Sequence, residues 1–171
     1  MKKITLLLFV FINFLAFSQN PEQKLIDLGI ELPNIQKPLA SYVDAVRVGN
    51  IIYLSGKGPK KSDGTFITGK VGTEITVEEA IKAAELTAIN QLAALKNEIG
   101  SLNKVKRIVK VFGMVNCTSD FTQHPFVING FSNLMVEIFG EKGKHARSAV
   151  GMNSLPFNIS VEIEMIVQVE D

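Results

Sequence analysis

The sequence predicts an α+β domain in which two main helices pack on one face of a mixed β-sheet. A long amphipathic helix begins at Thr76, and segments rich in β-branched residues stand before and after it. The final segment alternates apolar and polar side chains residue by residue, as a half-buried strand does. The order of elements is hairpin, helix, strand, helix, strand, strand, which favours helices gathered on one face of the sheet. The other face is partly polar, so it meets either solvent or another subunit.

The first residues are typical of a secretory signal peptide. Lys2 and Lys3 precede an apolar run over residues 4–17, and Ala16 and Ser18 supply small residues at a cleavage site. A membrane anchor is the alternative, but about 14 apolar residues are short for a spanning helix. We expect residues 1–18 to be removed and residues 19–171 to form a single exported domain, periplasmic or secreted.

The beginning of this domain predicts a short helix over residues 21–28, stopped by Gly29. Pro33 and Pro38 then indicate an extended linker. Two strands are expected over residues 42–48 and 51–55, joined by the two-residue hairpin Gly49-Asn50.

The clearest helix begins at Thr76 and ends before Gly100. Thr76 forms a capping box with Glu79. Its apolar side chains recur every three or four residues, a pattern of core packing. They are Val77, Ala80, Ile81, Ala84, Ala88, Leu92, Leu95 and Ile99. The remaining elements are a strand over 105–116, a helix from Pro125 to Phe139, and strands over 147–152 and 159–169.

Composition excludes several kinds of site. Cys117 is the single cysteine, so no internal disulfide forms, and with His124 and His145 it has no metal-ligand spacing. We expect no metal and no cofactor, and we interpret Cys117 as a small packed residue. Without residues 1–18 the formal charge of +1 becomes −1, which is not the footprint of a nucleic-acid-binding protein. The one basic cluster lies on the strand over 105–116, where alternation of faces prevents a single stripe.

The last quarter of the chain is chemically the richest. Arg147 and Glu162 stand on two apolar, strand-like segments joined by a turn that contains Pro156. An arginine offers a planar fork that binds a carboxylate in two places, and a glutamate beside it could activate a water. The pair predicts a small-acid site with a general base. Glu164 lies on the same face as Glu162 and is its rival for that role.

Several blocks of the chain resemble the RidA/YjgF family and come in the family's order over nearly all of residues 19–171. The blocks are Ser41-Tyr42-Val43-Asp44-Ala45-Val46, Gly49-Asn50, Tyr53-Leu54-Ser55-Gly56, Ala146-Arg147-Ser148-Ala149-Val150, Leu155-Pro156 and Val161-Glu162-Ile163-Glu164. Residues 143–151 and the N-terminal helix resemble a longer subgroup labelled endoribonuclease.

The resemblance implies a chorismate-mutase-like fold, assembled as a homotrimer with ligand sites in clefts between subunits. It also implies hydrolysis of reactive enamines and imines to 2-oxo acids and ammonia. Arg147 matches the arginine that binds the substrate carboxylate, and Glu162 matches the glutamate associated with the attacking water. Tyr42, Ser55 and Gly56 match pocket residues near the hairpin, and Asn129 matches a pocket asparagine.

The chain departs from the deaminase pattern at Ser41, Ala149 and Gly151, which reshape the pocket but leave the carboxylate fork in place. Three functions follow. The first is an enamine or imine hydrolase (a deaminase), and the second is a non-catalytic trimer that binds small carboxylates. The third is an endoribonuclease, which the charge balance and the lack of a paired-histidine arrangement disfavour.

Overall fold

The computed structural model of the chain describes residues 20–35 and 41–171. The expected signal peptide and Pro38 lie outside the described residues. The helices are α1 (Pro21–Asp27), α2 (Val77–Ile99) and α3 (His124–Phe139). The strands are β1 (Ala45–Val48), β2 (Ile51–Lys57), β3 (Val105–Asn116), β4 (Ala146–Met152) and β5 (Val161–Val169). Three short 3-10 turns complete the elements.

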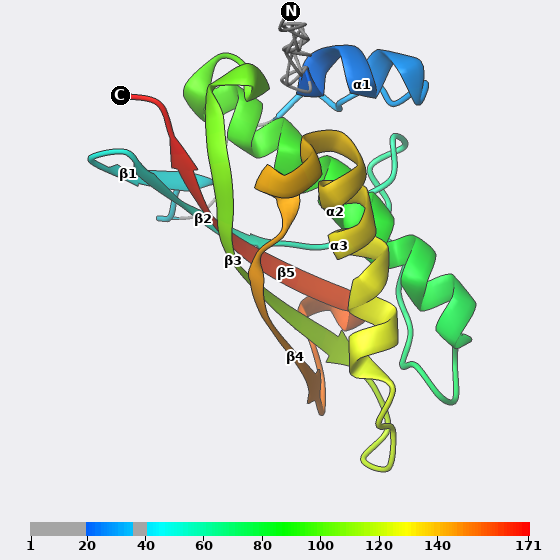
Figure 1. Cartoon of the computed structure of the whole chain (residues 1–171). Coiled ribbons are helices and arrows are strands. Elements are labelled where there is room, and N and C mark those ends of the chain that lie inside the picture. The colour runs from blue at the N-terminus through cyan, green and yellow to red at the C-terminus, as the bar shows by residue number, and fades with distance from the viewer. Residues whose placement is uncertain (1–19, 36–40) are drawn as a thin grey trace, which may run out of the picture.

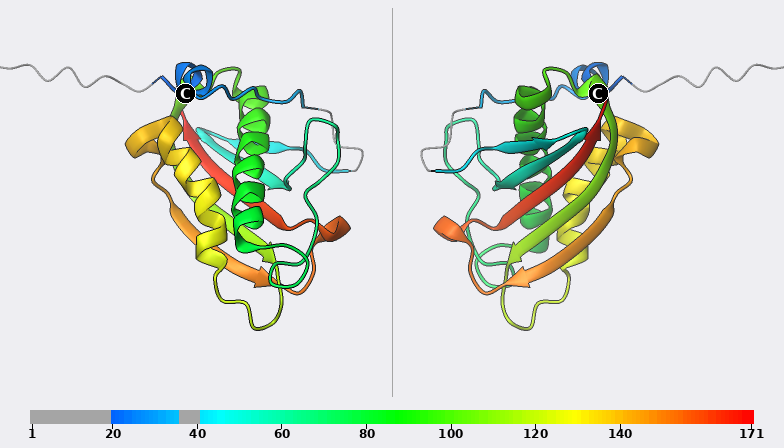
Figure 2. Two further views of the ribbon diagram at one scale, coloured as in Figure 1. Left: turned by 90° about the vertical axis from the view of Figure 1, so that its right-hand side faces the viewer. Right: turned by 90° about the vertical axis from the view of Figure 1, so that its left-hand side faces the viewer.

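The five strands form one mixed sheet in the order β1-β2-β5-β3-β4. All neighbours are antiparallel except β3 and β4, which run parallel across the α3 crossover. Helices α2 and α3 lie side by side on one face of this sheet, and the opposite face is left open (Figures 1 and 2). The prediction of an α+β domain with two main helices on one face is confirmed.

The helices form where their sequences favour them. The Thr76 side chain accepts a hydrogen bond from the Glu79 amide while the Glu79 carboxylate accepts one from the Thr76 amide, so the predicted capping box is present. Helix α3 has Pro125 in its first turn, where a missing N–H costs nothing. The core lies between these helices and the inner face of β5, whose odd-numbered residues are all buried. No helix among the described residues is long and apolar enough to cross a bilayer.

Four strand boundaries differ from those predicted, and one of them is the start of β4, which lies at Ala146 rather than Arg147. Strand β1 begins at Ala45 rather than Tyr42, β5 begins at Val161 rather than Ile159, and β2 continues to Lys57. The backbone N–H of Ser55 donates to the Asp44 carbonyl, which holds residues 42–44 beside β2 although they lie outside the ladder. The extension of β2 includes a break in register between Leu54 and Lys57 opposite β5.

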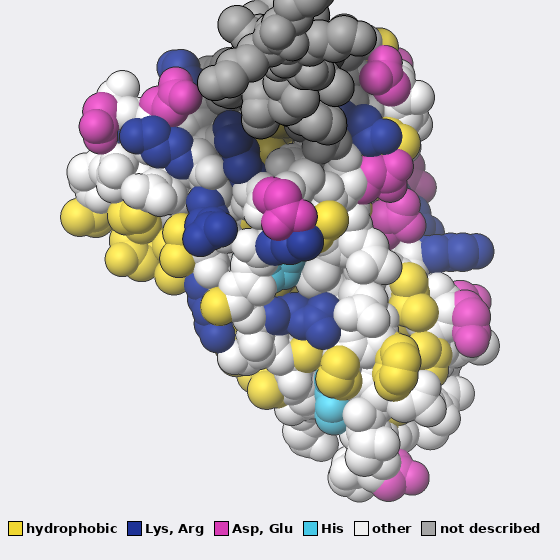
Figure 3. All heavy atoms as spheres, viewed as in Figure 1, with side chains coloured by type: hydrophobic (Ala, Val, Ile, Leu, Met, Phe, Trp, Pro, Cys, Tyr) yellow, Lys and Arg dark blue, Asp and Glu magenta, His cyan; other side chains and the backbone are white. Residues whose placement is uncertain are grey.

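The open face of the sheet carries exposed hydrophobic side chains at its β1–β2 end. Val46, Val48 and Tyr53 are about half exposed or more. Figure 3 shows hydrophobic side chains gathered on this side of the molecule and Lys and Arg side chains over the middle of the view. An apolar patch of this kind suits contact with another chain better than contact with water.

Candidate functional site

Arg147 lies on β4 with its side chain toward α3. Its Nη1 donates to Asn129 Oδ1 at 2.9 Å and to Ser132 Oγ at 3.0 Å, and its Nη2 donates to the Pro125 carbonyl at 3.3 Å. Arg147 is therefore in direct contact with Asn129, the residue that the family resemblance matches to a pocket asparagine. Three bonds to one helix give the guanidinium a fixed orientation.

The same guanidinium has no carboxylate partner among the described residues. Its three acceptors are all neutral oxygens, so they orient the charge of Arg147 without cancelling it. Two N–H groups remain, one on Nε and one on Nη2, and these two nitrogens lie on the edge that receives a carboxylate side-on. Burial lowers the pKa of Arg147 from its usual value, but a guanidinium stays charged at neutral pH. Arg147 is thus a partly buried cation that is held in a fixed orientation and still has N–H groups with which to bind an anion.

Behind Arg147 lies His145. Its Nε2 is 3.0 Å from Ser132 Oγ, and its Nδ1 is 2.7 Å from the Gly143 carbonyl oxygen. Burial, with a smaller contribution from the charge of Arg147, lowers the pKa of His145, while the bond to Gly143 opposes this shift. His145 is therefore neutral at pH 7.

Glu162 lies on β5 and points toward the open face. Its carboxylate has neither a hydrogen-bond donor nor a cation among the described residues of the chain. Burial raises the pKa of Glu162, and the charge of Glu164 raises it further. A carboxylate with a raised pKa is a better base at neutral pH than an ordinary one.

Gly56 provides the space for this carboxylate. A Cβ added at Gly56 would lie 3.0 Å from Cγ and Cδ of Glu162 and closer still to Oε1. Gly56 lies at the break in register of β2, and Gln91 of α2 binds the backbone beside it from the helix-covered face of the sheet. Gln91 Nε2 donates to the Ser55 carbonyl at 2.9 Å and to the Ile163 carbonyl at 2.5 Å.

Ser55 and Tyr42 join the Glu162 side of the sheet. Ser55 Oγ donates to the Val43 carbonyl at 2.6 Å, and Lys57 forms an ion pair with Asp44. These contacts hold the segment before β1 against β2. Tyr42 itself is 57% exposed, so its ring is available to a ligand or to another chain.

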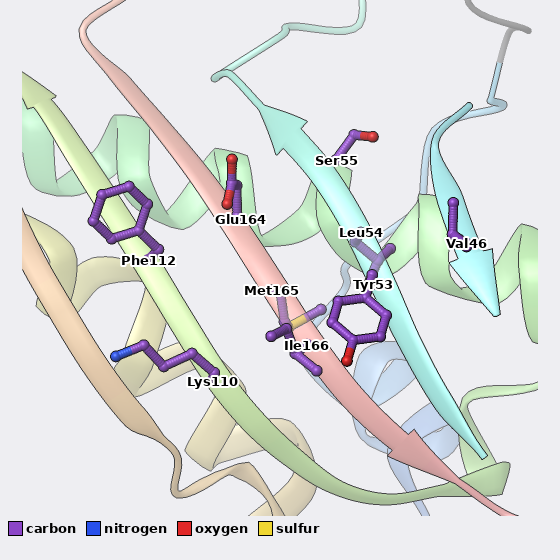
Figure 4. A pocket seen from close by; sticks show the side chains of 9 residues that line it. All are labelled: Val46, Tyr53, Leu54, Ser55, Lys110, Phe112, Glu164, Met165 and Ile166. Carbon is purple, nitrogen blue, oxygen red and sulfur yellow. The ribbon is translucent and has the colours of Figure 1, made fainter. Parts of the chain in front are cut away.

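A hollow of about 300 Å³ lies on the open face and includes Ser55. Figure 4 shows Glu164 within it, between Ser55 and Phe112, with Lys110 farther along the face. Lys110 Nζ donates to Ser148 Oγ at 2.9 Å rather than to Glu164. Glu162 and Glu164 therefore lie on the same face of the sheet, and both are candidates for the base.

The predicted residues thus fall into two groups on opposite faces of the sheet. Arg147 pairs with Val111 of β3, and Glu162 pairs with Met114 of the same strand. Because successive side chains of a strand alternate faces, partners of residues three apart point in opposite directions. Within one chain, the side chains of Arg147 and Glu162 therefore point to opposite faces of the sheet.

Sequence reasoning missed Ser132 and His145 as partners of Arg147. Two spacings could have found them. Ser132 is three residues after Asn129 and so lies on the same helix face, and His145 is two residues before Arg147 and so lies on the same side of the strand.

Cys117 is buried, and its sulfur lies 3.4 Å from His124 Nε2. Burial raises the pKa of Cys117, so the thiol is protonated at neutral pH. Gly151 stands where a side chain would collide with both Cys117 and His124. Among the described residues no group of three His, Cys, Asp or Glu side chains could hold a metal ion.

Comparison with known proteins assigns the chain to a family. The family model described as "YjgF/chorismate_mutase-like, putative endoribonuclease" matches residues 22–168. The chain belongs to this family, the RidA/YjgF family. It is 39% identical over 145 residues to Protein TCP17 of Trypanosoma cruzi, covering 84% of this chain and 91% of that protein. It is 31% identical over 142 residues to a 2-iminobutanoate/2-iminopropanoate deaminase of Dermatophagoides farinae, covering 82% of this chain and 95% of that protein.

Among solved structures, the protein Atu1372 from Agrobacterium tumefaciens is 45% identical, with a TM-score of 0.81 over 88% of this chain and 94% of that one. RidA from a Psychrobacter species is 27% identical, with a TM-score of 0.55 over 81% of this chain and 94% of that one. The fold is therefore shared with both, and it agrees more closely with the Agrobacterium protein.

Proposed function

We propose that the protein is a RidA-type hydrolase that converts small carboxylate-bearing imines or enamines to 2-oxo acids and ammonia. The observation that carries the proposal is the state of Arg147. It is oriented by three neutral oxygens, it has no carboxylate partner among the described residues, and one N–H on Nε and one on Nη2 make no hydrogen bond to those residues. One relative's name, 2-iminobutanoate/2-iminopropanoate deaminase, supports the same substrate class.

Arg147 would bind the substrate carboxylate through Nε–H and the second Nη2–H. A charge-assisted, bidentate contact of this kind is strong and directional. It would place the adjacent C=N carbon at a fixed distance from the guanidinium, which is the orientation that a positioned water needs.

Glu162 would supply the base. It accepts a proton from a water as the water oxygen attacks the C=N carbon, and a tetrahedral carbinolamine forms. Returning this proton to the nitrogen completes the carbinolamine. Glu162 would then carry the hydroxyl proton of the carbinolamine to the same nitrogen as the carbon–nitrogen bond breaks, so that the carbonyl of the 2-oxo acid forms and ammonia leaves. Because its pKa is raised by burial and by the charge of Glu164, the Glu162 carboxylate is a stronger base than an ordinary glutamate.

The two groups would meet between chains. Within one chain Arg147 faces α3 while Glu162, Gly56 and Ser55 face the open side. A homotrimer whose clefts join the Arg147 group of one subunit to the Glu162 group of the next would complete the site. The exposed Val46, Val48 and Tyr53 of the open face support such an interface.

Two measurements test the proposal. Purified protein is assayed for release of ammonia from freshly generated 2-iminobutanoate, and 2-oxobutanoate binding is measured by calorimetry. Arg147→Ala should abolish both, because loss of the fork leaves the anion unpaired at a cost of roughly 2–5 kcal/mol. Glu162→Gln should keep binding and lower turnover by about 10²–10⁴-fold.

Other results would redirect the assignment. If Glu164→Gln removes turnover and Glu162→Gln does not, Glu164 is the base. If 2-oxobutanoate binds but the imine is not hydrolysed, the non-catalytic carboxylate-binding function replaces this one. If RNA is cleaved and Arg147→Ala leaves that cleavage intact, the endoribonuclease named for a Shewanella oneidensis relative gains support.

We also propose that residues 1–18 direct export and are then removed. The short apolar run with small residues at its end supports this. The intact mass of protein recovered from the periplasm or medium should correspond to residues 19–171, and a mass that retains residues 1–18 would favour an anchor.

A further inference from the structure

A continuous chain of hydrogen bonds leads from Arg147 away from the expected ligand. Arg147 Nη1 contacts Ser132 Oγ at 3.0 Å, Ser132 Oγ contacts His145 Nε2 at 3.0 Å, and His145 Nδ1 contacts the Gly143 carbonyl at 2.7 Å. The imidazole also packs edge-on against Phe131, with ring centroids 6.5 Å apart. Its partners therefore fix the ring on both sides.

The chemistry of the end groups fixes every proton in this chain. A guanidinium can only donate, so Ser132 Oγ accepts from Arg147 and directs its single proton toward His145 Nε2. A carbonyl can only accept, so the proton of His145 lies on Nδ1 and is donated to Gly143. For a neutral imidazole, the Nδ1–H tautomer is the one arrangement that satisfies all three contacts.

We propose that Ser132 and His145 are positioning residues that hold the Arg147 guanidinium in the orientation that receives a carboxylate. The inference rests on the proposed carboxylate-binding role of Arg147. Ser132, His145 and the Gly143 carbonyl are all neutral, so they restrain the guanidinium without reducing its attraction for an anion. A direct carboxylate in place of Ser132 would restrain it as well but would compete with the substrate.

In this series of hydrogen bonds, His145 contacts Arg147 only through Ser132, so any effect of His145 on ligand binding must depend on Ser132. Two variants of His145 separate the packing of its ring from its role as a hydrogen-bond acceptor. His145→Phe keeps a ring against Phe131 but removes the acceptor, whereas His145→Gln loses the ring but offers an amide oxygen to Ser132. Ser132→Ala removes the link and changes little else.

The first test is a double-mutant cycle on 2-oxobutanoate binding, measured by calorimetry. Ser132→Ala and His145→Phe should each weaken binding by roughly threefold to tenfold, the effect of one lost hydrogen bond. His145→Phe added to Ser132→Ala should change binding less than about twofold, and His145→Gln should recover most of the loss. Thermal melts of all variants report folding separately. Independent, multiplying effects of the two substitutions, or no effect of either, would overturn the proposal.

The second test needs no ligand. In ¹⁵N NMR at neutral pH, His145 should show the Nδ1–H tautomer, and the Arg147 Nη groups should give resolved signals because rotation about the guanidinium is slow. Ser132→Ala should average those signals. If wild type binds no 2-oxobutanoate, the proposed function fails, and this measurement still decides the positioning role. An Nε2–H tautomer, or averaged Nη signals in wild type, would refute it.

Discussion

Gly56→Ala tests the account at the point where the backbone comes closest to the proposed base. The added methyl would lie 3.0 Å from Cγ and Cδ of Glu162, against ordinary contacts of 3.4–4 Å, and closer to Oε1. Because the obstacle is the end of a flexible side chain, the carboxylate should withdraw by about 1 Å while the backbone stays in place. A misplacement of this size costs about 10²-fold in turnover when it moves a catalytic group.

Binding and stability should respond differently from turnover. Gly56 has no positive φ, so alanine fits the backbone, and the smaller entropy of the unfolded chain offsets part of any strain, by about 0.4–1 kcal/mol. We expect 2-oxobutanoate binding within about threefold of wild type, because Arg147 is untouched. Ammonia release from 2-iminobutanoate, calorimetry and a thermal melt measure the three quantities.

Gly58→Ala is the matched control. Its added methyl would lie 2.9 Å from Ile159 Cδ1 and 3.4 Å from Phe66, so it meets apolar side chains and not Glu162. It should affect stability as much as Gly56→Ala but leave turnover near that of wild type. Wild-type turnover in Gly56→Ala, or equal losses in the two variants, would refute the reasoning.

Three further predictions concern stability. Gln91→Leu removes the donor from one buried and one part-buried carbonyl oxygen and should lower the free energy of unfolding by about 2–5 kcal/mol in urea titration. A change under about 0.5 kcal/mol would contradict the role of Gln91 at the break in register of β2. Thr76→Ala removes the side-chain cap of α2 and should lower the free energy of unfolding by about 1 kcal/mol in the same titration. An unchanged free energy of unfolding would contradict a stabilising role of this cap. Burial lowers the pKa of His145 in the folded protein below the value of about 6.5 for an unfolded chain. As pH falls below about 6.5, the unfolded chain therefore takes up a proton on His145 before the folded protein does, and the free energy of unfolding decreases until the lower folded pKa is reached. The urea midpoint of wild type should therefore fall more between about pH 7.5 and 5.5 than that of His145→Gln, and parallel curves would contradict a buried neutral imidazole.

Much of the fold could be predicted because local signals were strong. The capping box at Thr76, the terminator Gly100 and the alternation along β5 are each determined by neighbours in sequence. The start of β1 was less predictable, since Tyr42 to Asp44 have strand-like composition but bond to β2 through Ser55 outside the ladder. No local pattern distinguishes these two kinds of extended backbone.

The sequence identified candidate residues for the site but not their arrangement. Arg147, Asn129, Gly56 and Glu162 were all identified from the sequence, and the structure places them in two groups. The face that each group occupies depends on the register between strands that lie far apart in the sequence. The spacing of residues within one strand carries no information about that register. Ser132 was missed for a related reason, because its partner lies on another element.

The central claim is that Arg147 of one subunit works with Glu162 of another, and subunit complementation tests it most directly. Arg147→Ala and Glu162→Gln proteins, each inactive alone, are mixed under conditions of subunit exchange, and native mass spectrometry verifies the mixed trimers. With equal amounts and random assembly, about one quarter of the clefts would combine an intact Arg147 with an intact Glu162, so activity should return to about one quarter of wild type. Mixed trimers that remain as inactive as the separate variants would contradict a site shared between subunits.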